Sequence, residues 1–207
     1  MKKFLESSVL NKASKMFIKS LLCAFIIYTA LTMTEFDAQS REISNEVLRL
    51  HIIANSDSAR DQQIKLLVRD KVQSMCKDLY PESCTKEQAR SILENKLPEL
   101  VQAACEMVRE QNCDLPVHGE IVNMYFTNRV YDDITLPAGN YDALRLTIGN
   151  GEGHNWWCVM FPPICIAASG GDISDVLTDE QTELVKSDKI EYKFKLYEIY
   201  EDLTNKL

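Results

Sequence analysis

The chain has 207 residues, a formal net charge of −8 and a hydrophobic fraction of 45%. A chain of this length and composition can bury one sizeable core, so a single domain is expected after any N-terminal segment. The acidic balance argues against binding to a phosphate backbone, which needs clustered Lys and Arg. It excludes nucleic acid as a main ligand.

The N-terminal residues have the layout of an export signal. Five lysines precede the uncharged run Leu21–Met33, and a basic flank before a short apolar run is typical of a secretory signal. The run is short for a membrane span, which needs about 20 apolar residues, although Phe17–Met33 would approach that length if Lys19 snorkelled. A buried core helix is the alternative that the lysine flank disfavours.

These features predict three parts of the chain. Residues 1–33 are expected to be a signal peptide or an N-terminal membrane anchor, and residues 34–45 a linker. Residues 46–207 are expected to form a single secreted α+β domain. The body should lie on the outer side of a membrane, because the positive flank stays cytoplasmic.

The body opens with a strand and a helix. Apolar residues alternate along Glu46–Ala54, with Arg49 and His51 on the other side, which predicts a strand. Asn55–Ser58 offers side-chain oxygens that suit a helix cap, and the helical spacing of apolar residues continues to Tyr80–Pro81. Asp57 is most simply a cap residue.

A second helix is predicted after Thr85. Thr85 and Gln88 have the spacing of a capping box, and apolar residues follow on one face as far as Val108. Pro98 is expected either to kink this helix or to split it.

The pattern then changes to the period of a strand. Val117–Phe126 and Asn128–Ile134 are β-like, and Pro137–Asn140 is a predicted turn. Two further apolar runs, Ala143–Ile148 and Trp156–Phe161, are joined by a glycine-rich turn and predict a β-hairpin.

Later residues are less regular. Gly170–Asp175 is a predicted polar loop, and Thr178–Asp188 is too polar to place. Glu191–Leu203 fits a last helix better than a strand. The expected order is β-α-α-β-β-β-(α), an α+β domain in which helices cover one face of a mainly antiparallel sheet.

Six cysteines lie in the body, an even number that suits an oxidising compartment. Cys158 and Cys165 flank a proline doublet, where a chain reversal would bring them within bonding distance. The other four lie in the helical region and are either cross-links between two helices or small buried hydrophobes. They are Cys76, Cys84, Cys105 and Cys113.

Catalytic and metal sites find little support. His154 lies four residues before Cys158, which raises a secreted Cys–His hydrolase acting on the cell envelope as the alternative function. No third residue orients such a pair. The spacing of His154, Cys158 and Cys165 matches no common zinc site. The glycine-rich turn lacks the lysine and helix of a phosphate loop. No catalytic residue, cofactor or metal is therefore expected.

Two blocks in the middle of the chain resemble the stage II sporulation protein R family. The first is Leu48–Asp57 with Asp61–Gln62 and Lys65–Asp70, and the second is Gly139–Arg145 with Ile148–Gly149 and Gly151–Cys165. The resemblance implies a signalling protein of endospore-forming bacteria that is secreted into the space between forespore and mother-cell membranes. It implies that the partner is a membrane-embedded aspartic protease of the mother cell, activated to cleave the precursor of sporulation sigma factor E.

The residues that carry this resemblance are candidates for partner contact or for a structural motif. Because neighbouring residues of a strand point to opposite faces, one tryptophan of the pair should enter the core and the other should leave that face. An exposed Trp would be a natural binding hot spot. The candidates are Arg49, His51, Asn55, Asp57, His154, Asn155, Trp156 and Trp157, with Cys158 and Cys165 as a candidate disulfide.

Overall fold

The computed structural model describes residues 2–77, 79–81, 84–131, 134–162 and 177–186. The chain divides into two units, Met1–Gln39 and Ser40–Leu207, and each is described by itself. The predicted loop Gly170–Asp175 and the predicted element Glu191–Leu203 lie outside the described residues.

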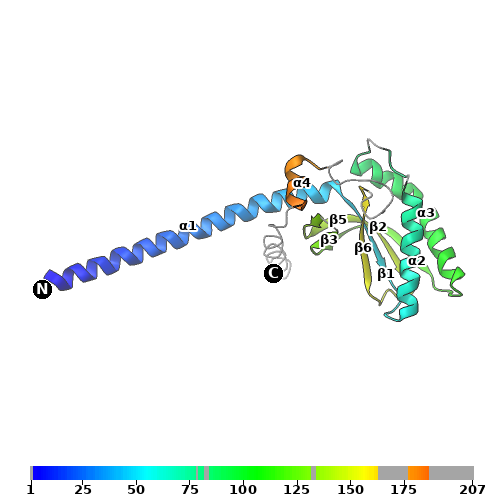
Figure 1. Cartoon of the computed structure of the whole chain (residues 1–207), viewed down its shortest axis with the longest axis horizontal. Coiled ribbons are helices and arrows are strands. Elements are labelled where there is room, and N and C mark those ends of the chain that lie inside the picture. The colour runs from blue at the N-terminus through cyan, green and yellow to red at the C-terminus, as the bar shows by residue number, and fades with distance from the viewer. Residues whose placement is uncertain (1, 78, 82–83, 132–133, 163–176, 187–207) are drawn as a thin grey trace. The chain divides into compact units, whose positions relative to one another are not determined.

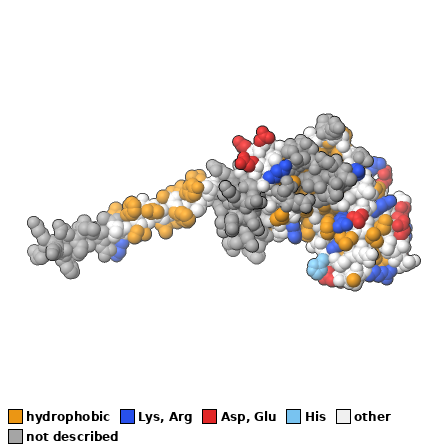
Figure 2. Space-filling model, viewed as in Figure 1, with side chains coloured by type: hydrophobic (Ala, Val, Ile, Leu, Met, Phe, Trp, Pro, Cys, Tyr) orange, Lys and Arg blue, Asp and Glu red, His pale blue; other side chains and the backbone are white. Residues whose placement is uncertain are grey.

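The described residues of the first unit, 2–39, belong to helix α1, Lys2–Glu46. Large apolar side chains between Met16 and Leu31 are more than half exposed, and Figure 2 shows hydrophobic groups along this helix. Across the part of the chain that the structure describes, no helix combines the length and the apolar character required to cross a bilayer.

The second unit begins with the last turns of α1. Residues 34–45, for which we predicted a linker, are helical, and Ser40, Ile43 and Ser44 are buried. The domain therefore includes helical residues ahead of its first strand.

A four-stranded sheet forms the centre of this unit (Figure 1). Its order is β2 (Val117–Phe126), β5 (Gly139–Ile148), β1 (Leu48–Ile53) and β6 (Asn155–Phe161). β1 runs parallel to β5 and antiparallel to β6, and β2 runs antiparallel to β5. Two of the three neighbouring pairs are thus antiparallel.

The predicted hairpin between the two apolar runs is wrong. β5 and β6 do not pair, because β1 lies between them and Leu50 is the neighbour of both Leu144 and Cys158. β1 is buried at five of its six positions, as a central strand covered on both faces should be. The turn after Ile148 therefore crosses two strand spacings, about 10 Å, instead of one.

Two helices cover one face of the sheet, as predicted. α2 (Ala59–Cys76) is capped by Ser58, whose hydroxyl accepts from the backbone N–H of Asp61. α3 (Lys86–Glu110) begins with the predicted capping box and continues through Pro98 without a break. α2 ends before the predicted boundary at Tyr80–Pro81.

The core under these helices contains residues from both helices and from four strands. The four cysteines of the helical region are free thiols, so the cross-link that we considered there is not formed. The fully buried members include Leu50, Ile52, Val68, Val72, Leu93, Ala104, Leu144 and Leu146.

The opposite face of the sheet is also covered. A small hairpin of β3 (Arg129–Tyr131) and β4 (Ile134–Leu136) and the short helix α4 (Asp179–Lys186) contribute to a second core cluster. Its members are Ile43, Val47, Phe126, Ile134, Leu136, Tyr141, Ala143, Val159, Leu177 and Val185. The α+β class is confirmed, with apolar packing on both sides of the sheet.

Candidate functional site

The two sequence blocks meet at one end of the sheet, where their loops interlock. The Asn55 side chain accepts a hydrogen bond from the backbone N–H of Asn150 at 3.0 Å and donates one to Asp61 at 2.8 Å. The backbone N–H of Gly153 donates to the carbonyl of Ala54 at 2.9 Å. These contacts join the end of β1 to the connection between β5 and β6.

His154 is held in the same loops. Its backbone N–H donates to Asp57 Oδ1 at 2.6 Å, and its Nδ1 contacts the same oxygen. The hydrogen bond from His154 lowers the pKa of Asp57. Lys65 Nζ donates to the His154 carbonyl at 2.8 Å and to Gln62 at 2.6 Å. Asn55, Asp57 and His154 therefore fasten two loops together.

Arg49 is fully buried on the face opposite α2 and α3. Its guanidinium carbon lies 4.2 Å from the centre of the Phe126 ring and 4.9 Å from that of Tyr141, and it donates to the Tyr131 hydroxyl. No described carboxylate pairs with it, and its Nε and Nη1 atoms have no hydrogen-bond partner in the described part of the chain. Burial lowers its pKa.

His51 belongs to an aromatic layer on the same face, made by the rings of Phe126, Tyr131, Tyr141 and Trp157. Its ring stacks on Trp157 with centroids 3.9 Å apart and planes 7° apart, and Phe126 meets Trp157 edge-on. Burial lowers the pKa of His51. Both Arg49 and His51 lie on the predicted side of β1. That side is covered by aromatic rings and is not open to solvent.

The two tryptophans point to opposite faces, as the alternation of a strand requires. Trp156 packs beside the helical core, with the Arg69 guanidinium 4.3 Å from its ring. Trp157 packs with the second cluster. Both are partly buried, and their neighbour Asn155 is exposed at the start of β6. Each tryptophan therefore has packing partners of its own.

The described residues do not assemble the Cys–His pair. Cys158 is buried and disulfide-bonded, and its sulfur accepts a hydrogen bond from Gln73 of α2 at 3.2 Å. His51 points to the other face, and His154 contacts Asp57 at the sheet end. Cys165 lies outside the described residues, so its pairing stays a prediction. No group of metal-ligating side chains gathers within the described ranges.

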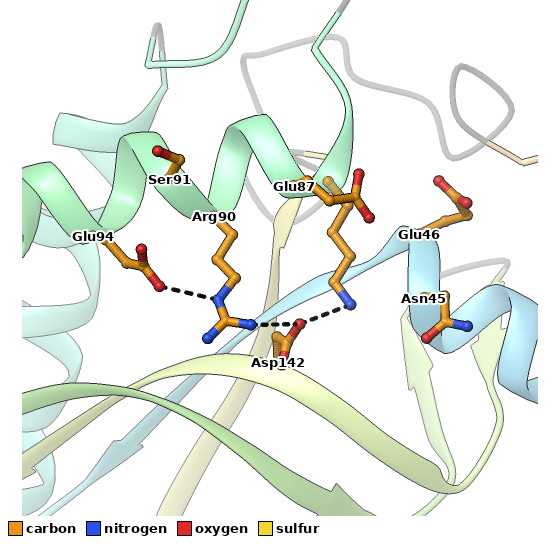
Figure 3. A pocket seen from close by; sticks show the side chains of 8 residues that line it. Asn45, Glu46, Glu87, Arg90, Ser91, Glu94 and Asp142 are labelled. Carbon is orange, nitrogen blue, oxygen red and sulfur yellow. Dashed lines mark hydrogen bonds and ion pairs between the residues drawn. The ribbon is translucent and has the colours of Figure 1, made fainter.

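A pocket of about 580 Å³ lies where the first turns of α3 face the end of α1 and strand β5 (Figure 3). Arg90 and Asp142 point toward one another, and Arg90 also pairs with Glu94 at 3.1 Å. Lys86 Nζ lies 2.9 Å from Asp142 and donates to the Ser44 carbonyl at 3.4 Å. The pocket is lined by Asn45, Glu46, Lys86, Glu87, Arg90, Ser91, Glu94 and Asp142.

The electrostatic centre of this pocket is Asp142. Burial would raise its pKa, but hydrogen bonds from Asn123 and Lys86 outweigh that effect and lower it. Sequence reasoning missed the pocket, because the partners of Asp142 lie on a distant helix. The available signal was the spacing of Lys86, Arg90 and Glu94 at successive turns of a predicted helix.

Together these features define a class of protein, an α+β domain. Its candidate polar residues make contacts within the domain, either between its loops or with its aromatic side chains. Within the described ranges no catalytic or metal site is assembled. The comparisons with known proteins give the family. The chain belongs to the stage II sporulation protein R family, whose model matches residues 44–170. This range includes both interlocked loops, the aromatic layer and the pocket.

One curated relative supports the same assignment. Stage II sporulation protein R of Bacillus subtilis (strain 168) is 32% identical over 160 residues, which cover 77% of this chain and 71% of that protein. No solved structure matches the chain.

Proposed function

We propose that this protein is a secreted intercellular signal of endospore formation. It activates a membrane-embedded aspartic protease of the mother cell, which then cleaves the precursor of sporulation sigma factor E. Membership of the stage II sporulation protein R family carries this proposal. The family places the chain in sporulation, and the activation of a protease is the step that we add.

The N-terminal segment supports a position outside the forespore cytoplasm. Lysines precede the apolar run Leu21–Met33, the arrangement of a signal peptide or an anchor. On this proposal the body acts in the space between the forespore and mother-cell membranes, either released or held at the membrane by residues 1–33.

The contacts of the candidate residues favour an activator over the alternative hydrolase. A Cys–His hydrolase needs a thiolate beside an imidazole. Cys158 is disulfide-bonded, and the exposed His154 is engaged with Asp57. The polar groups that sequence reasoning offered as catalytic thus have structural partners.

An activator works by binding the active arrangement of its receptor more tightly than the inactive one. A protease that functions as a dimer would be switched by a ligand that bridges or reorients its outward-facing segments. The domain needs only a rigid surface for this role, and the interlocked loops and two packed faces of the sheet supply rigidity.

The test is processing of the sigma-factor precursor in cells that produce the protease with or without this chain. We expect processing to depend on the chain and to survive His154→Ala, with His118→Ala on the exposed side of β2 as a matched control. Loss of processing with His154→Ala, in a variant that remains folded, would favour the hydrolase. Processing that is equal without the chain would refute the proposal.

A further inference from the structure

The pocket beside Asp142 has more carboxylates than cations. Glu46, Glu87, Glu94 and Asp142 line it, against Lys86 and Arg90. Both cations form ion pairs with Asp142, and Arg90 also forms one with Glu94. Among the residues that the structure describes, no cation pairs with Glu46 or Glu87.

The position of Glu46 increases this negative charge. It is the last residue of α1, whose final turn has no basic side chain. The carbonyl end of a helix already carries partial negative charge, and a carboxylate there adds to it. The cation that reaches this turn, Lys86 at the Ser44 carbonyl, is ion-paired with Asp142. Glu46 is also partly buried, which weakens its hydration. Glu87, in contrast, lies in the first turn of α3, where a carboxylate is favourable.

A second pocket of about 400 Å³ adjoins the first across α3. It is lined by Pro81, Cys84, Gln88, Ser91 and Ile92, so an exposed serine, Ser91, belongs to both pockets. The first pocket has an excess of carboxylates, and the second offers the apolar groups of Ile92 on α3 and of Pro81, which precedes the helix.

We infer that the first turns of α3, from Thr85 to Glu94, are the docking surface for an extended peptide segment of a protein partner. The segment crosses the helix at Ser91. It places a basic side chain between Glu46 and Glu87 and an aliphatic side chain against Ile92. Charge complementarity selects this occupant, because an acidic segment would meet two carboxylates that have no ion-pair partner among the described residues. The inference that this surface contacts the activated partner rests on the proposed function.

Binding is measured first with the full chain in nonionic detergent and without the protease. The probes are fluorescent peptides with one Arg and one Leu separated by one to three residues. Matched probes carry citrulline, which has the shape of Arg without its charge. At least one Arg peptide should bind about fivefold more tightly than its citrulline match, and the difference should shrink at high salt. Equal binding by every matched pair, or no binding, overturns the inference.

Chain variants place the site. Glu46→Gln and Glu87→Gln should each weaken binding of the Arg peptide about two- to fivefold, whereas Glu106→Gln, on the exposed side of the same helix, should not change it. Ser91→Trp should block binding by filling the crossing point, and Gln102→Trp is its control on an exposed position further along α3. Binding that survives Ser91→Trp refutes the assigned surface.

The same variants then enter the processing assay. Loss of processing with Ser91→Trp but not with Gln102→Trp supports α3 as the surface that meets the protease. Normal processing by a Ser91→Trp variant that no longer binds peptide refutes that role while the activator function stands. If the wild-type chain supports no processing at all, the proposed function fails, and the peptide measurements still decide the binding site.

Discussion

Gly153→Ala tests the interlocked loops most sharply. A Cβ at this position would lie 2.3 Å from the Ser56 carbonyl oxygen and 2.9 Å from the Ala54 Cβ. The first of these atoms is backbone, so rotation of a side chain cannot relieve the clash. The loop must instead move away from the end of β1.

That movement has a magnitude that follows from the contacts. It would break the bonds from the N–H of Gly153 to the Ala54 carbonyl and from the N–H of Glu152 to the Asn55 carbonyl. Two hydrogen bonds at about 1 kcal/mol each, with about 1 kcal/mol of residual overpacking, give a loss of about 3 kcal/mol. For a domain of this size the melting temperature should fall by about 6–12 °C.

Thermal unfolding of the full chain, followed by circular dichroism, measures this loss. Glu152→Ala is the control, because it removes an exposed side chain and keeps the backbone N–H. A melting temperature for Gly153→Ala within about 2 °C of the wild type would refute the claim that these loops fasten the domain.

Three further predictions concern buried groups. Asp142→Asn should destabilise the domain by about 3 kcal/mol in urea unfolding, because it leaves Lys86 buried beside an uncharged group; adding Lys86→Met should recover much of that loss. Since burial lowers the pKa of His51 below its ordinary 6.5, stability should be full above that pH and fall as pH drops through the folded pKa. His51→Phe should remove that part of the pH dependence. Burial raises the pKa of Cys76 to about 12, so iodoacetamide should modify the exposed Cys23 in the native chain but not Cys76.

Each of these predictions has a contradicting outcome. A double variant at Asp142 and Lys86 that is no more stable than Asp142→Asn alone would contradict the argument from unpaired charge. If the pH dependence of stability is unchanged in His51→Phe, a group other than His51 causes the loss of stability in acid. The control is His118→Gln, which changes an exposed histidine. Rapid alkylation of Cys76 in the native state would show that its burial is transient.

Local patterns predicted the elements well. β2 has the predicted bounds Val117–Phe126, and α3 begins at the predicted capping box of Thr85 and Gln88. Each depends on residues that are close in the sequence, so period and cap chemistry suffice to find it.

The pairing of strands was not predictable in the same way. The apolar runs that became β5 and β6 look like hairpin partners because they are adjacent in the chain. β1 displaces that pairing, and nothing local to either run indicates an inserted strand. The decisive property is the burial of β1 on both faces, which depends on what covers each face.

The same limit applies to the candidate site. The sequence places Arg49 opposite the apolar positions of β1, which suggests solvent. The rings of Phe126, Tyr131 and Tyr141 cover it instead, from strands far along the chain. Likewise, Asp142 meets Lys86 only because β5 lies under the start of α3. The sequence was therefore sufficient to identify the motif residues. Their contact partners lie far along the chain and could be identified only from the folded structure.

On the proposed function, the chain activates the protease from the outer side of the membrane. The most direct measurement uses vesicles that contain the membrane protease, with the sigma-factor precursor inside and the full chain added outside. We expect cleaved precursor to appear only when the chain is added, and we expect the His154→Ala variant to produce it as well. Cleavage that is the same with and without the added chain would show that the chain does not activate the protease.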